Sequence, residues 1–548
     1  MAKKMFLFLM VLAAAAMGCS GPARETVTES QITAIVASEP NTIDPALNTA
    51  VDGAIYLVHA FEGLYKYVDN GRGDAILAPG QAESAPEKTA NADGTVTYVF
   101  KLRRNLKWSD GQALTAKDFV YSWQRLVDPE IAADYSYQLD MVKNANEIMA
   151  GDLDKSQLAV RAVDDYTLEV ILTYDCPYFF EIVAFPATFP VREDIIAKAG
   201  DQWTFNPSTY IGNGPYRLRE WTHNSYLLFE KNPNYYDPAS GPDLIRFALM
   251  DDDNAMLAGF RNGEIDFIEE MPVDEIPSLL ANGELKIVPY LGTYFVCFNN
   301  QKAPFTDARV RKAFSLAIDR NYIVNQITQT GELPATAYVP SGIVDAGGGG
   351  TDFRQVGGGY YKTGTSDYQA NVEEARQLLA AAGFPGGRGF PVVEYAYNTN
   401  DRHRAIGEAL QDMWHTALGV NVTLANQDWA VFLDNRKVGN YQIARHGWIA
   451  DYNDPISFLD MWVTGGGNDD AQYAVPEYDR LIAGAKATSV PAERMRFMHQ
   501  AEDILMGRDH AVGPIYFYTQ KYMMNPKLSG LYYTPLGFFY FTQIKIAP

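Results

Sequence analysis

The sequence lacks the short motifs that mark common catalytic and nucleotide-binding sites. It contains no G-x-S-x-G, G-x-x-x-x-G-K-[ST], H-E-x-x-H or G-x-G-x-x-G, the patterns of nucleophile elbows, phosphate loops, zinc proteases and dinucleotide folds. Its seven histidines include no pair spaced i,i+3 or i,i+4. The chain therefore offers no recognisable nucleophile–base pair or metal cluster. We expect no enzyme activity, no metal and no cofactor.

Cysteine and positive charge are also scarce. The 548 residues include three cysteines, and Lys+Arg 45 against Asp+Glu 67 give a formal net charge of −22. Proteins that bind a phosphate backbone need clustered positive charge, so nucleic acid is not an expected partner. Beyond Cys19 at the N-terminal end, Cys176 and Cys297 could form a disulfide if they lie close together, or each could fill a small buried site.

Long apolar runs are absent except at the N-terminus. "MAKK" followed by "MFLFLMVLAAAAM" is typical of a signal peptide, which we assign to residues 1–18. The following "AMGCS" resembles a bacterial lipobox, with Ala16 where Leu is usual. This resemblance implies lipid attachment at Cys19 and a lipidated linker over 19–30. We expect an exported protein, lipid-anchored at the cell membrane and facing the periplasm or the exterior.

Regular α/β periodicity follows the linker, in a chain long enough for two or three domains. Alternating apolar residues predict a strand over 95–102, and a capping box formed by Thr115 and Asp118 begins a helix over 115–129. Helical patterns also cover 307–320 and 371–383, whereas the glycine-rich stretch 345–366 indicates a long surface loop.

One short stretch raises a question about function. In "RHGWIADYNDP" (445–455), Asp454 precedes Pro455 and an apolar run, which predicts a helix N-cap. Asp451 follows the strand-like run 441–450 and has no capping role there. A carboxylate in this position needs another partner.

Several blocks resemble one family along the whole chain after the signal peptide. They are similar to the bacterial extracellular solute-binding proteins of family 5, the peptide/nickel type, and most similar to the oligopeptide-binding lipoproteins of ABC importers. These blocks are "LKWSDGQALTAKDFVYSWQRLVDP" (106–129), "IGNGPYRLREW" (211–221) with "NPNYYD" (232–237), "PFTDARVRKAFSLAIDR" (304–320), "NQDWAVFLDNR" (426–436) and "ARHGWIADYNDPISFL" (444–459).

The resemblance implies an α/β, periplasmic-binding-protein-like two-lobed fold (class II, cluster C) with an extra small domain. Two connecting strands near residues 291 and 518 would act as a hinge. The implied domains are a discontinuous domain I (31–61, 188–291 and 519–548), a small domain II (62–187) and a domain III that forms the ligand lobe (292–518).

The resemblance also assigns a peptide-binding site. Asp451 is at the position that binds the peptide's α-ammonium, and a buried ammonium does require a carboxylate partner. Tyr135 lies near the ligand N-terminus, and Arg445 and His403 are at positions that receive ligand carboxylates. The backbone near Gly447 would take an extended peptide as an added strand. The remaining implied contacts are the pocket-lining Trp429, Arg436 and Trp448 and a backbone contact at Val51.

Some positions depart from the family pattern or have simpler explanations. Thr49 and Cys297 stand where the family has acidic residues, and Thr328 stands where it has a lysine, which leaves the preferred peptide length open. Arg445 could be the structural ion-pair partner of Asp451, and His403 could be a solvated surface residue.

The implied function is that of a monomeric substrate-binding lipoprotein. It would capture short peptides in an extended conformation in a closing interlobe cleft and deliver them to an ABC permease. Two alternatives remain: the same fold with a non-peptide cargo such as a nickel chelate, haem or a sugar, and a secreted peptidase.

Overall fold

The computed structural model describes residues 29–346 and 351–547. The signal peptide 1–18, Cys19 and most of the linker 19–30 lie outside the described residues. Within the described ranges, no helix combines the length and apolar character needed to cross a membrane.

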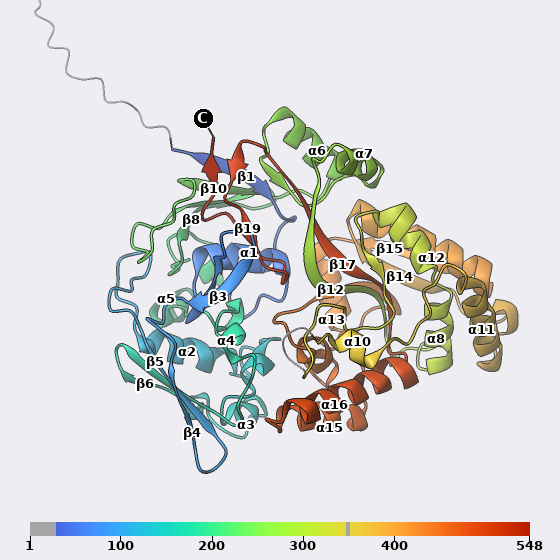
Figure 1. Cartoon of the computed structure of the whole chain (residues 1–548), viewed down its shortest axis with the longest axis horizontal. Helices are drawn as coiled ribbons and strands as arrows, with labels where there is room; N and C mark the ends of the chain where they lie inside the picture. Colours follow the sequence, from blue (N-terminus) through green and yellow to red (C-terminus); the bar gives the residue numbers. More distant parts are fainter. Residues whose placement is uncertain (1–28, 347–350, 548) are drawn as a thin grey trace, which may run out of the picture.

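An 11-stranded sheet runs through the molecule, in the order β15-β14-β16-β12-β17-β11-β1-β10-β9-β8, with β13 also paired to β17. One arm of this sheet lies in each lobe (Figure 1). The strands are β1 (Gln31–Ile35), β8 (Tyr216–Thr222), β9 (Tyr226–Lys231), β10 (Leu244–Ala248), β11 (Phe267–Ile268), β12 (Lys286–Phe298), β13 (Leu333–Pro334), β14 (Val393–Asn398), β15 (Val422–Gln427), β16 (Ile443–Ile449) and β17 (Val512–Met524).

The long strands β12 and β17 connect the two lobes. They pair antiparallel, and their register shifts between Pro289 and Thr293. Gly292 lies in this break, where a Cβ atom would come 2.3 Å from Ile449 Cδ1. A side chain therefore does not fit at the crossing point. The family resemblance implies a hinge in this region, near residues 291 and 518, and that hinge stays a prediction.

A second, four-stranded sheet with the order β4-β5-β7-β6 lies in the first lobe, beside α2 (Figure 1). The strand expected over 95–102 is β5, and its buried positions alternate. The capping box of Thr115 and Asp118 begins α2 as expected. The elements are β4 (Glu87–Ala90), β5 (Val96–Lys101), β6 (Val160–Asp164), β7 (Thr167–Leu172) and α2 (Ala116–Leu126).

The other helices include α1 and α6 in the first lobe and a larger group in the second. The helices predicted over 307–320 and 371–383 are present as α8 and α11, although α8 ends four residues early. The bounds are α1 (Val51–Ala60), α6 (Asp253–Asn262), α8 (Ala308–Leu316), α10 (Phe353–Gly357), α11 (Tyr368–Ala381), α12 (Asp401–Leu418), α13 (Trp429–Lys437), α14 (Ile456–Leu459), α15 (Pro476–Lys486) and α16 (Pro491–Glu502).

Two local predictions need correction. The stretch 345–366 is not simply a surface loop, because it contains α10, whose Phe353 ring stacks on His499 with centroids 3.9 Å apart. Asp454 is not a simple N-cap. Its carboxylate accepts from the backbone N–H of Ile456 at 3.0 Å and from both terminal nitrogens of Arg494, at 2.6 and 2.7 Å. The helix that follows, α14, spans only four residues. The main role of Asp454 is therefore the buried ion pair with Arg494.

Cys176 and Cys297 are both buried and both free. The Sγ atom of Cys297 lies 3.2 Å from the hydroxyl of Tyr441. The sequence allowed either a disulfide or two separate buried side chains, and the structure shows two separate buried side chains.

Candidate functional site

A cavity of about 600 Å³ lies where the two lobes meet. Its walls come from the start of α1 and the segment after β11 in the first lobe, and from α12, α13 and β16 in the second. The structure brings all nine predicted site residues to this one cavity: Val51, Tyr135, His403, Trp429, Arg436, Arg445, Gly447, Trp448 and Asp451.

Contacts between the lobes enclose the cavity. Lys437 of the second lobe forms an ion pair with Asp134 of the first at 2.6 Å. Nearby, Asn468 donates to the hydroxyl of Tyr137 at 3.2 Å. These contacts hold the lobes together beside the cavity.

Asp451 is a buried carboxylate held between the lobes. It is 7 % exposed. Its Oδ1 accepts from the hydroxyl of Tyr135 at 2.9 Å and its Oδ2 from Nε2 of Gln138 at 3.2 Å, and both donors belong to the opposite lobe. Its own N–H donates to Ser457 Oγ at 2.8 Å. Among the described residues no cation pairs with it.

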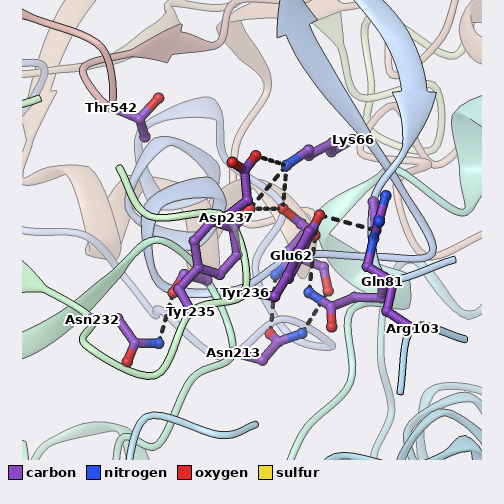
Figure 2. A network of polar contacts seen from close by, with 12 residues as sticks. Glu62, Lys66, Gln81, Arg103, Asn213, Asn232, Tyr235, Tyr236, Asp237 and Thr542 are labelled. Atoms are coloured by element: carbon purple, nitrogen blue, oxygen red, sulfur yellow. Dashed lines mark hydrogen bonds and ion pairs between the residues drawn. The ribbon is translucent and has the colours of Figure 1, made fainter. Parts of the chain in front are cut away.

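Glu62 shows what a completed buried acid looks like in the same molecule. Its carboxylate accepts from the hydroxyls of Tyr235 and Tyr236 and lies 3.3 Å from Nζ of Lys66 (Figure 2). Asp451 has one hydroxyl and one amide but lacks the cation. Burial consequently raises the pKa of Asp451 to about 8, against the lowering effect of its two hydrogen bonds. An ammonium group would complete this site and restore the charged carboxylate.

The strand β16 presents an open edge next to Asp451. On one side it pairs with β12 from Ile443 to Ile449. On the other side its ladder with β14 covers Ile443 and Ala444 alone. Beyond Ala444 the second edge of β16 has no strand partner among the described residues, and it faces the cavity. An extended chain can add to such an edge by main-chain hydrogen bonds.

Gly447 leaves room for a neighbouring side chain at this edge. A Cβ atom there would come 2.3 Å from the hydroxyl of Tyr518. The adjacent Trp448 donates its indole N–H to the carbonyl of Ser457 at 2.7 Å, and its ring lies 6.4 Å from that of Tyr135. Trp448 therefore supports the residues around Asp451.

Arg445 carries an unneutralised charge at the far end of β16. Its Nε donates to Asn398 Oδ1 at 2.7 Å, and its guanidinium lies 5.4 Å from the centre of the Trp429 ring. Within the described ranges it forms no ion pair, so it is not the structural partner of Asp451. A free cation at this end suits a ligand carboxylate.

His403 stands beside Arg445 and is half-buried, not solvated. Its Nδ1 lies 3.3 Å from the hydroxyl of Tyr294. Burial, with the nearby charges of Arg445 and Arg402, lowers its pKa well below the ordinary value. The imidazole is thus neutral and can donate one hydrogen bond.

Arg436 differs from Arg445, because its charge is already neutralised. Its Nε donates to Asp470 Oδ2 at 2.5 Å, and the same oxygen lies 3.0 Å from Nε2 of His446. Arg436 therefore shapes the wall and offers no free charge.

Of the three residues that depart from the family pattern, the structure places one at the cavity and two in the interior. Thr49 lines the cavity, but Thr328 and Cys297 are fully buried and do not. Thr328 instead donates to Glu332 at 3.0 Å. The sequence interpretation also missed six polar lining residues, because no local pattern marks them as part of a cavity: Asp52, Glu269, Glu270, Arg402, Gln520 and Lys521.

Two lobes that are joined by long strands and enclose a cavity between them are the architecture of a solute-binding protein. The chain belongs to the family described as "Bacterial extracellular solute-binding proteins, family 5 Middle", which it matches over residues 77–470. It is 36 % identical over 531 residues to the periplasmic oligopeptide-binding protein OppA of Salmonella typhimurium, covering 96 % of this chain and 94 % of that one. The family resemblance is thereby confirmed.

Solved structures agree. Haemophilus influenzae OppA in complex with RPPGFSPFR matches with a TM-score of 0.85 and 30 % identity, over 95 % of this chain and 99 % of that one. The Escherichia coli murein tripeptide-binding protein MppA matches with 0.86 and 32 % identity, over 95 % and 99 %. The unliganded open form of MppA matches with 0.61 at the same identity, over 94 % and 97 %. The lobe arrangement here therefore differs from that open form.

Proposed function

We propose that the protein is the substrate-binding lipoprotein of an ABC-type importer and that it binds short peptides in an extended conformation between its lobes. The observation that carries this proposal is Asp451, a buried carboxylate without a cation, next to the open edge of β16. A peptide's α-ammonium supplies the cation, and its backbone supplies the missing strand. A relative named as an oligopeptide-binding protein and a solved neighbour in complex with the peptide RPPGFSPFR support it.

The opposite end of the peptide would lie near Arg445 and His403. Asp451 and Arg445 are six residues apart, and a strand rises about 3.3 Å per residue. Along the strand the two residues are therefore about 20 Å apart, a distance that about six extended peptide residues span.

The alternatives fit the site less well. A nickel chelate, haem or a sugar brings no free amine to complete Asp451. A metallopeptidase would need a group of metal-binding side chains, and the described residues show no group of three. The relatives and solved neighbours are named as binding proteins, which favours binding over peptidase activity. We further propose that the protein is a monomer and that it delivers its bound peptides to an ABC permease.

Retention without cleavage is the expected behaviour with a mixed peptide pool. The protein should enrich short peptides with free amino termini, and mass spectrometry of the released material should return them at unchanged mass. Truncated products in the bound or unbound fraction would favour the peptidase, and recovery of no peptide would favour another cargo.

Lipid anchoring at Cys19 is a separate proposal, which rests on the lipobox-like "AMGCS". Cys19→Ser should abolish lipidation and move the protein from the detergent phase to the aqueous phase. Several acyl chains anchor firmly because each buried CH₂ contributes about 0.8 kcal/mol. Equal detergent partitioning of Cys19→Ser and wild type would contradict the anchor.

A further inference from the structure

A second polar region of the cavity lies away from Asp451. It combines Glu269 and Glu270, which follow β11, with Asp52 on α1 and Gln520 on β17. The charge of Glu270 is already neutralised, because its carboxylate pairs with Lys521 at 2.9 Å and with Arg402 at 3.1 Å. The other three residues, Asp52, Glu269 and Gln520, are named here the acceptor wall.

Each member of the acceptor wall has an oxygen that receives no hydrogen bond. These atoms are Asp52 Oδ2, Glu269 Oε1 and Gln520 Oε1, all buried and all on residues that line the cavity. Gln520 is 3 % exposed, and its Nε2 donates to the carbonyl of Gly537 at 3.3 Å. That bond fixes the amide and leaves its oxygen without a donor. Buried polar atoms in folded proteins normally have partners, so three orphaned acceptors need an explanation.

These residues converge on one wall. A Cβ atom at Gly537 would come 2.9 Å from the Tyr290 ring and 3.0 Å from Cγ1 of Val51, the neighbour of Asp52. The side-chain amide of Gln520 donates to the carbonyl oxygen of the same glycine, Gly537. Burial together with the charge of Glu269 raises the pKa of Tyr290 well above its ordinary value, and Asp52 adds to this effect. α1, the segment after β11 and β17 thus bring the acceptor wall together.

The wall is short of positive charge. Burial raises the pKa of Asp52 to about 6 and that of Glu269 well above its ordinary value. The neighbouring cations Arg402 and Lys521 are both held by Glu270. Unpaired donors also occur there, namely Nε of Arg402 and the hydroxyls of Tyr56 and Tyr516, but among the described residues no cation forms an ion pair with Asp52 or Glu269. Two buried acids without a counterion favour a ligand group that is positively charged and carries only donors.

We propose that the acceptor wall binds a cationic side chain of the ligand, an ammonium or a guanidinium group, and makes the protein selective for peptides with a basic residue. Such a group is charged and consists of donors alone, and an ammonium has three, one for each orphaned oxygen. This inference rests on the proposed peptide-binding function and adds a side-chain preference to it.

The test is calorimetric titration with short alanine peptides that have free termini and carry lysine, norleucine or glutamate at each position in turn. At one position, lysine should bind about 10- to 100-fold more tightly than norleucine, as expected for hydrogen bonds to charged groups. Glu269→Gln should reduce this ratio of lysine to norleucine affinity to about 3-fold or less. Glu264→Gln, the same change at an exposed position, should leave the preference intact.

Asp52→Asn is the second variant and should lose the lysine preference in the same way, so a poorly folded Glu269→Gln does not end the test. Norleucine peptides that bind while no position prefers lysine would overturn the inference and leave the proposed function standing. Absence of binding by every peptide would overturn both. A lysine preference unchanged in both variants would place the basic residue elsewhere and also overturn the inference.

Discussion

Asp451→Asn is expected to weaken the binding of a free-amine peptide by about 30- to 5,000-fold. The asparagine keeps the shape of the side chain but leaves the ligand ammonium buried without a carboxylate, a loss of roughly 2–5 kcal/mol. N-acetylation of the peptide should weaken wild-type binding to a similar degree. The two losses should be far from additive because both remove one interaction. Calorimetric titration of the four protein–peptide combinations measures this.

The matched control is Asp412→Asn, which removes the same charge from an exposed position of α12 in the same lobe. It should leave affinity and amine discrimination unchanged. Ligand-free Asp451→Asn should also melt no lower than wild type, because a desolvated acid has been replaced by a neutral group. Equal wild-type affinity for free and acetylated peptides would refute the assignment of Asp451 and favour a cargo without an amine.

Asp454→Ala, three residues along the chain, is expected to act in the opposite way. It should cost about 3–5 kcal/mol of folding free energy, because it leaves the guanidinium of Arg494 buried and unpaired. Both side chains are almost fully buried, and the pair is bidentate. A helix cap alone would cost about 1 kcal/mol. Chemical denaturation of the ligand-free protein distinguishes these two values.

The double variant Asp454→Asn/Arg494→Met is the check on this reasoning. It removes the orphaned charge and should recover much of the lost stability, since buried ion pairs are often replaceable by apolar groups. Asp454→Ala protein that stays folded should still discriminate free from acetylated peptides. A loss near 1 kcal/mol in the single variant would mean that the Arg494 pair contributes little.

The sequence predicted the parts of this molecule that depend on local pattern. The capping box at Thr115 and the alternation of β5 fix their elements because the relevant contacts lie within a few residues. The two-lobed fold and the candidate site residues followed from family motifs. The structure places those residues around one cavity, while their roles remain predictions.

Contacts between distant residues could not be predicted in this way. Asp454 looks like a cap in the sequence because Arg494 lies forty residues further on. The ion pair of Arg436 was missed for the same reason, because Asp470 lies 34 residues away. Glu269 and Asp52 stand in polar stretches that resemble ordinary surface. Their burial arises only when the lobes and β17 come together, which no periodicity records.

The position of Asp451 between the lobes has a consequence for an unloaded molecule. Closing without a cation takes its carboxylate out of water, and because burial raises its pKa to about 8 the group must take up a proton to close. This contribution to the shut state is complete below about pH 4 and is lost as the pH rises through about 8. A bound ammonium removes the need for the proton. We therefore expect an unloaded molecule to close less readily than a loaded one at neutral pH, so that a transporter which binds the closed form would bind few unloaded molecules.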